Sequence, residues 1–182
     1  MIEVRNVHKS FGTQVVLNGI NLDIENGKTT TIVGPSGVGK SVLLKLIMGI
    51  LPADSGKIFI DQDEITALTS EVDKNRVREK LGVLFQGAAL FDSITLYDNI
   101  AFPLVEKGRL GRQEIHDKVV AMLEALSLAS YAFLLPNEVP IGTRKRAGLA
   151  RALITEPKIL LFDEPNTGLD PLVGQEVYGL IK

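Results

Sequence analysis

The sequence predicts an α/β fold with a helical segment inserted into a sheet-containing core. Strand-like patterns dominate the chain up to Phe85, helical patterns follow as far as Thr155, and a continuous apolar run returns at Lys158. The glycine-rich stretch 34–41 lies between a β-branched run and an apolar helical run, as in an α/β unit. At 182 residues the chain is long enough for one domain with a real core.

The expected strands are short runs in which apolar and polar side chains alternate, or in which apolar or β-branched residues follow one another. In chain order they are 1–7, 17–24, 29–33, 57–61, 81–85 and 158–162. The first two are separated by a turn near Gly12. The last lies between Pro157 and Asp163 and is apolar after Lys158, which is typical of a strand covered on both faces.

The expected helices are segments in which apolar residues recur every three or four positions. In chain order they are 40–49, 70–80, 95–106, 111–127, 143–155 and one that starts at Pro171. The helix from Lys40 is apolar on nearly every side and should be buried. Thr95 or Ser93 is the expected cap of the third helix, and Pro103 is expected to interrupt it.

Composition excludes several classes of protein. The net charge is −2 with acids and bases interspersed, which argues against a nucleic-acid partner. The chain has no cysteine, hence no disulfide and no thiolate metal site. Its start is not a signal peptide, and no apolar run approaches the roughly 18 residues of a membrane span, so a membrane role would need a partner.

The stretch 34–41 carries the clearest chemistry in the sequence. It reads Gly34, Pro35, Ser36, Gly37, Val38, Gly39, Lys40 and Ser41, the Gly-x4-Gly-Lys-Ser pattern of a phosphate-binding loop. Glycines let backbone N–H groups surround a phosphate chain, and the following helix adds its positive end. Lys40 would reach the β- and γ-phosphates and Ser41 would ligate Mg²⁺. The alternative is a glycine turn with an incidental lysine.

A second candidate group follows the last expected strand. Asp163 and Glu164 come directly after the apolar run 159–162, so a buried strand would deliver two acids to the edge of the sheet where α/β proteins bind ligands. Asp163 would hold Mg²⁺ through its water shell, and Glu164 would act as general base toward an attacking water. Taken alone, the acids could equally mark an ordinary strand end.

Together these motifs resemble the ATP-binding-cassette (ABC) ATPases over essentially the whole chain. The phosphate loop, Gln86, the helix 148–153, the acidic strand and 168–170 follow in that family's order and spacing. Within the family, 84–92 and 97–104 are similar to the ATPase subunit of Mla-type phospholipid transporters, which include toluene-tolerance proteins. The resemblance implies a P-loop NTPase with a RecA-like mixed or parallel sheet, an N-terminal antiparallel β subdomain and an inserted helical subdomain.

The resemblance also implies roles for individual residues. Phe11 would stack on adenine, although it could be an ordinary core residue. Gln86 would ligate Mg²⁺, sense the γ-phosphate and take part in catalysis with Lys40 and Glu164. Alternatively, Gln86 could be no more than a polar residue at the end of a strand. Val42 keeps the backbone N–H of a phosphate-contacting position but lacks the usual threonine hydroxyl. Asp170 would contact the opposite subunit.

A larger assembly follows from the same resemblance. Two copies would form a head-to-tail homodimer around two ATP molecules, at the cytoplasmic face of the inner membrane. The region 86–104 would receive a helix of a permease; its apolar residues could also be subdomain core, and they are Ala88, Ala89, Leu90, Phe91 and Tyr97. We expect a single ATP-binding domain over 1–182, incomplete at its C-terminus, with a core subdomain (1–86 and 156–182) and a helical subdomain (87–155).

The sequence departs from the family pattern at two further places. The signature stretch should read close to Leu-Ser-Gly-Gly but reads Val139, Pro140, Ile141 and Gly142. Only Gly142 fits a γ-phosphate contact, because Pro140 has neither hydroxyl nor N–H. Arg144, Lys145 and Arg146 could supply charge, or could form a solvated face. No histidine follows the acidic strand; the chain stops before the strand that would carry it, which suggests a fragment of a longer protein.

Two functions therefore remain in competition. The first is Mg²⁺-dependent ATP hydrolysis that powers lipid transport. The second is a nucleotide-binding module with little or no turnover, which the altered signature and the missing histidine favour.

Overall fold

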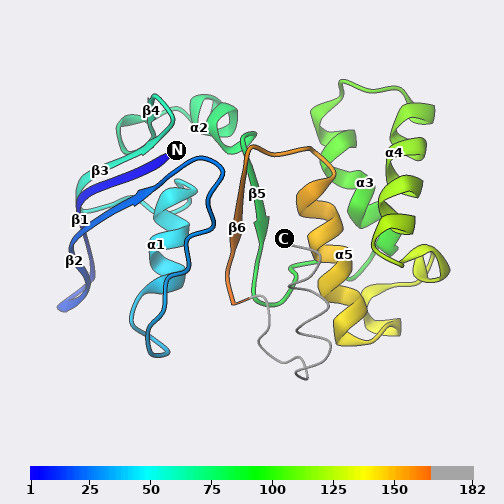
Figure 1. Cartoon of the computed structure of the whole chain (residues 1–182), viewed down its shortest axis with the longest axis horizontal. Coiled ribbons are helices and arrows are strands. Elements are labelled where there is room, and N and C mark those ends of the chain that lie inside the picture. The colour runs from blue at the N-terminus through cyan, green and yellow to red at the C-terminus, as the bar shows by residue number, and fades with distance from the viewer. Residues whose placement is uncertain (165–182) are drawn as a thin grey trace. The chain divides into compact units, whose positions relative to one another are not determined.

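A computed structural model describes residues 1–164 of the chain (Figure 1). The described residues form two compact units, one of residues 1–81 and one that starts at Gly82. The predicted last helix from Pro171 lies outside the described residues. The assignment of 1–86 and 156–182 to a core and of 87–155 to a helical subdomain stays a prediction.

The first unit is built on a four-stranded sheet in the order β2-β1-β3-β4, with antiparallel pairing. The strands are β1 (Ile2–Phe11), β2 (Gln14–Ile24), β3 (Ser55–Ile60) and β4 (Asp63–Glu64). Ile2 lies opposite Ile24 on one side and Ile60 on the other, and it is buried between them. The predicted N-terminal antiparallel subdomain is thereby confirmed, with both of its first strands longer than expected.

Helix α1 (Lys40–Ile47) packs against β3. It buries Leu43, Leu46 and Ile47, and the 3₁₀ turn η1 (Ile65–Ala67) adds the buried Ile65 to the same core. The predicted helix from Lys40 is confirmed, but it ends at Ile47, two residues before the predicted end at Gly49. Its apolar face is what fixes the position of the loop that precedes it.

Residues 29–33 were expected to be a strand, and this prediction is wrong. They form no ladder with any described strand, and the side chain of Val33 is 88% exposed. The reason is that β-branched residues favour a strand only where a partner strand supplies hydrogen bonds and a packing surface. None of the strands in residues 1–164 supplies them to this segment.

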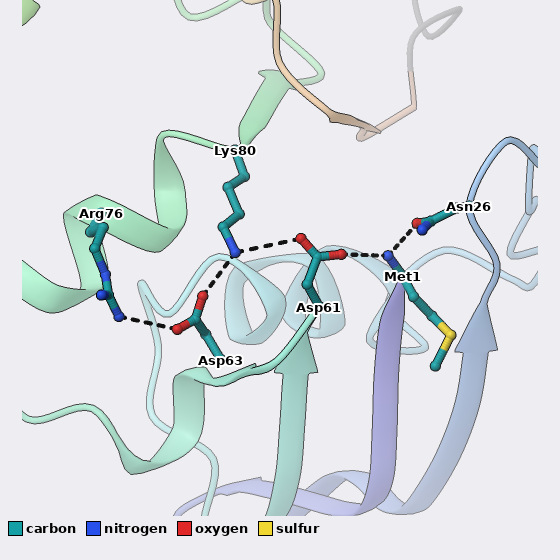
Figure 2. A network of polar contacts seen from close by, with 6 residues as sticks. All are labelled: Met1, Asn26, Asp61, Asp63, Arg76 and Lys80. Atoms are coloured by element: carbon teal, nitrogen blue, oxygen red, sulfur yellow. Dashed lines mark hydrogen bonds and ion pairs between the residues drawn. The ribbon is translucent and has the colours of Figure 1, made fainter.

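A chain of ion pairs ties the end of β3 to helix α2 (Glu71–Arg78), as Figure 2 shows. Lys80 Nζ lies 2.8 Å from Asp63 and 3.4 Å from Asp61. Arg76 contacts Asp63 at 3.1 Å, and the Met1 ammonium contacts Asp61 at 2.8 Å. These pairs hold the turn between β3 and β4 against the helix, although each exposed pair adds little stability by itself.

The second unit combines a strand pair with a helical layer. The strands are β5 (Leu81–Leu84) and β6 (Ile159–Phe162), which lie side by side and run in the same direction (Figure 1). Between them come α3 (Leu96–Lys107), α4 (Arg112–Ala125), η2 (Ala129–Tyr131), η3 (Pro136–Glu138) and α5 (Ile141–Leu153). Helix α3 contacts both α4 and α5, and their facing apolar side chains form one core with Leu84.

Three details of the second unit differ from expectation. Pro103 does not interrupt α3, because Ile100, Ala101 and Leu104 are buried around it and their packing outweighs one lost backbone bond. Helix α5 starts at Ile141, two residues before the predicted start. In β6 only Leu161 is buried, so the strand is not covered on both faces within the described residues.

Thr95 caps α3 as predicted, with its hydroxyl accepting the Asp98 N–H at 3.1 Å. Within residues 1–164, no helix combines the length and the apolar character that crossing a membrane would require.

Candidate functional site

Lys40 forms hydrogen bonds across the predicted phosphate loop. Its ammonium donates hydrogen bonds to the carbonyl oxygens of Gly34 (3.0 Å) and Pro35 (2.9 Å). Gly37 and Gly39 adopt φ values of 78° and 106°, a region that residues with side chains rarely enter. A Cβ on Gly39 would lie 2.8 Å from Val16 Cγ1, so glycine is also required by space. The loop is therefore preformed around the lysine.

The surroundings of this loop suit an anion. Residues 35–38 are exposed, and α1 begins without a side-chain cap and without an acid in its first turn. The positive end of the helix dipole is thus not offset by a carboxylate of that turn. Ser41 and Val42 lie in this first turn and are half-buried. The Ser41 hydroxyl is a hard oxygen donor of the kind that Mg²⁺ prefers.

Phe11 is placed at the end of β1 in the same unit. Its side chain is 48% exposed, so it is not a core residue, and the Lys9 ammonium lies 5.4 Å from the centre of its ring. An exposed ring at a hairpin end remains available for stacking. Its contact with adenine stays a prediction.

The second half of the predicted site forms within the second unit. Gln86 follows β5 and Glu164 follows β6, and the Gln86 side-chain amide donates to a Glu164 carboxylate oxygen at 3.2 Å. The Asp163 N–H donates to the Leu84 carbonyl at 2.9 Å, which continues the pairing of the two strands. The structure thus brings Gln86, Asp163 and Glu164 to one end of the strand pair.

Within residues 1–164 no group of three or more His, Cys, Asp or Glu residues could hold a metal ion. The predicted ligands Ser41, Gln86 and Asp163 are a different, mixed set.

Two cations that bond the backbone of the Gln86 segment, Lys145 and Arg151, were not predicted from the sequence as site residues. Lys145 is only 1% exposed, and its ammonium donates to the Gln86 backbone carbonyl. Burial lowers the pKa of Lys145, and the Glu164 carboxylate acts in the opposite direction. Arg151 donates to the Ala88 carbonyl at 2.9 Å, and burial lowers its pKa. For Lys145, the interpretation of 144–146 as a solvated face is therefore wrong.

The altered signature stretch forms the start of α5. Pro140 is the N-cap and Gly142 is the second helical residue. Ile141 is exposed, and no side chain caps this helix. Gly142 remains the one residue of the stretch that fits the expected γ-phosphate contact, and that role stays a prediction. Residues 168–170, including Asp170, lie outside the described residues.

The expected partner groove is in part core and in part exposed. Ala88 is buried, whereas Phe91 is exposed and packs against Phe102 with the rings tilted by 57° and 4.8 Å between their centres. Tyr97 stacks on the exposed Phe133 at 6.0 Å. Asn99 was missed from sequence: it is fully buried, and its side chain bonds both the N–H and the carbonyl of Phe91.

Comparison with protein families and sequences gives a consistent result. A family model described as ABC transporter matches residues 17–167. The intermembrane phospholipid transport system ATP-binding protein MlaF of Haemophilus influenzae is 42% identical over the whole chain, which spans 69% of that protein. The MlaF protein of Escherichia coli is 40% identical over 94% of the chain, which covers 64% of it. The chloroplastic protein TRIGALACTOSYLDIACYLGLYCEROL 3 of Arabidopsis thaliana is 38% identical, and the chain spans 54% of its length.

Solved structures give the same picture. The cassette MJ0796, in a dimeric post-hydrolysis state bound to ADP and phosphate, has a TM-score of 0.90 and 30% identity, and the match covers 100% of this chain and 81% of that one. CbiO1 from Clostridium perfringens, part of the CbiONQ transporter complex, has a TM-score of 0.86 and 31% identity, with 99% and 71% covered. The predicted fold class is confirmed by these similarities.

Proposed function

The chain belongs to the ABC transporter family, and we propose that it binds Mg²⁺-ATP in the loop 34–41 and hydrolyses it to drive lipid transport. The observation that carries this proposal is the loop itself. Lys40 bonds two of its carbonyl oxygens, its glycines Gly37 and Gly39 adopt left-handed conformations, and it leads into the positive end of α1, whose first turn has no acid. The lysine can exchange two carbonyl partners for phosphate oxygens without a change in the helix.

The proposed reaction assigns each residue a separate task. Lys40 and the N–H groups of the loop hold the β- and γ-phosphates. Ser41, Gln86 and Asp163 would hold Mg²⁺, which offsets the charge on the phosphate oxygens when bound. Glu164 accepts a proton from the attacking water, whose oxygen forms a bond to the γ-phosphorus while the bond to ADP breaks. Gln86 already donates to Glu164, an arrangement that orients the base.

The proposed partners follow from the relatives. The names of the MlaF proteins include phospholipid transport, and the similar cassette MJ0796 is a dimer. We extend both properties to this chain: a head-to-tail homodimer that docks through 86–104 on a permease at the cytoplasmic face of the inner membrane. The exposed ring pair of Phe91 and Phe102 offers apolar area for such a contact.

A nucleotide-binding module with little turnover is the second candidate function. The observation that favours it is the start of α5, where Pro140 offers neither an N–H nor a hydroxyl to a γ-phosphate. Lys40 and the loop glycines are present in either case. Binding of ATP is therefore common to both functions, and turnover distinguishes them.

The experiment compares ATP affinity and phosphate release in four proteins. Lys40→Ala should weaken ATP binding by about a hundredfold, since a charged phosphate contact is lost. Lys45→Ala is the matched control, because Lys45 is an exposed lysine on the same helix. Glu164→Gln should keep the affinity and lower turnover by about a hundredfold or more. Equal affinity in the Lys40 and Lys45 variants would overturn both functions, and wild-type turnover equal to that of Glu164→Gln would select the binding module.

A further inference from the structure

One face of α5 holds the backbone of the segment that carries Gln86. Lys145, Gly148 and Arg151 are spaced three residues apart, which places them on the same side of a helix. The Lys145 ammonium donates to the Gln86 carbonyl, and Arg151 donates to the Ala88 carbonyl at 2.9 Å. A Cβ on Gly148 would lie 2.9 Å from the Ala88 Cβ, so the backbone of this segment rests directly on the helix.

The segment needs such support because of its conformation. Ala88 and Ala89 both adopt left-handed backbone angles, with φ values of 63° and 49°. Alanine disfavours this region, so two such residues in succession are strained, and contacts from outside the turn offset that strain. Inside the turn, the Ala88 N–H donates to the Phe85 carbonyl at 2.9 Å. The contacts from α5 supply the remaining restraint.

Lys145 is the unusual member of this face. A buried ammonium is costly unless it finds an acceptor, and the acceptor here is the carbonyl of the residue whose side chain meets Glu164 at 3.2 Å. A carbonyl fixed in direction also fixes the Cα of its residue, and with it the direction in which the side chain leaves the backbone.

We propose that Lys145 is a positioning residue for the hydrolytic reaction: its buried ammonium, with Gly148 and Arg151, holds the turn 86–89 so that the Gln86 amide meets Glu164. This inference rests on the proposed function, since Gln86 and Glu164 act on ATP only if the chain hydrolyses it. Arg151 also lies 5.8 Å from the centre of the exposed Phe91 ring. The same helix face therefore contacts both the Gln86 turn and the proposed permease groove.

A double-mutant cycle separates positioning from simple space filling. Lys145→Met keeps the stem and removes the donor, and Lys145→Arg restores a donor. We expect Lys145→Met to lower kcat about tenfold with ATP affinity within twofold of wild type, and Lys145→Arg to recover most of the loss. In a Gln86→Ala background, Lys145→Met should change kcat by less than twofold, because alanine has no side-chain amide for the turn to position. Equal losses in both backgrounds would overturn the inference.

Amide hydrogen exchange tests the turn without reference to hydrolysis. Exchange of the Ala88 N–H should be about tenfold faster in Lys145→Met than in wild type. Lys118→Met is the matched control, because Lys118 is an exposed lysine of the same unit that pairs with Glu156; it should leave the exchange unchanged. An unchanged rate in Lys145→Met would overturn the inference. If wild type turns over no faster than Lys40→Ala, the proposed hydrolysis fails, and the exchange result still decides whether Lys145 holds the turn.

Discussion

Replacement of Asn99 by alanine should strongly destabilise the second unit, because this one side chain makes several buried hydrogen bonds. Asn99 is fully buried in α3. Its Oδ1 accepts the Phe91 N–H at 2.8 Å, and its Nδ2 faces the carbonyl oxygens of Phe91 (3.0 Å), Thr95 (3.0 Å) and Ile94 (3.2 Å). Two N–H hydrogens can serve two of these carbonyls at once, so the side chain makes three hydrogen bonds at a time. At about 1 kcal/mol net for each, the loss is about 3 kcal/mol.

Urea denaturation followed by far-UV circular dichroism measures this loss. With a slope of about 2 kcal/mol per molar urea, the midpoint should fall by about 1.5 M. Asn137→Ala is the control, because Asn137 is exposed in η3 of the same unit; it should change the free energy of unfolding by less than about 0.5 kcal/mol.

Asn99→Asp tests the pattern of donors and acceptors. It keeps the acceptor for the Phe91 N–H but turns a carboxylate oxygen toward carbonyl oxygens, so it should be at least as destabilising as Asn99→Ala. The reasoning is refuted if Asn99→Ala and Asn137→Ala unfold at the same urea concentration, or if Asn99→Asp is as stable as wild type.

Two further predictions concern the ion pairs of the first unit and the altered signature. The N-terminal ammonium lowers the pKa of Asp61, and the Lys80 ammonium lowers the pKa of Asp63, both from 3.8. A carboxyl with a lowered pKa contributes stability above its ordinary pKa and loses it as the pH falls through the lowered value. The melting temperature should therefore drop less between pH 5 and pH 3 in Lys80→Met than in wild type; equal drops would contradict this. The double change Pro140→Ser and Ile141→Gly should raise phosphate release about tenfold or more, because it restores a hydroxyl and a flexible N–H at the stretch for which we propose a γ-phosphate contact; an unchanged rate would show that the signature does not limit turnover.

Features that depend on nearby residues could be predicted from the sequence. The alternation in β1 and β2, the glycine loop, the helix from Lys40 and the Thr95 cap are all set by residues within a few positions of one another. The family resemblance implied separate roles for Gln86 and Glu164, but it did not predict the hydrogen bond between them, which joins residues far apart in the chain.

Features that depend on distant partners could not be predicted in the same way. Residues 29–33 have the composition of a strand, but a strand also requires a partner with a free edge. Pro103 has the chemistry of a helix breaker, yet the packing of α3 against α4 and α5 keeps the helix continuous. In both cases the decisive contact comes from another element of the chain.

The helical periodicity of α5 carries a signal for the burial of Lys145. It precedes Leu149 by four residues and Ala152 by seven, so it lies on a stripe whose apolar members are buried. A solvated face would place a cation on the opposite side of the helix. A cation on the buried stripe must instead meet an acceptor, and in the structure that acceptor is a backbone carbonyl. The identity of the carbonyl, that of Gln86, depends on the turn that follows β5, and the sequence pattern of α5 alone cannot determine it.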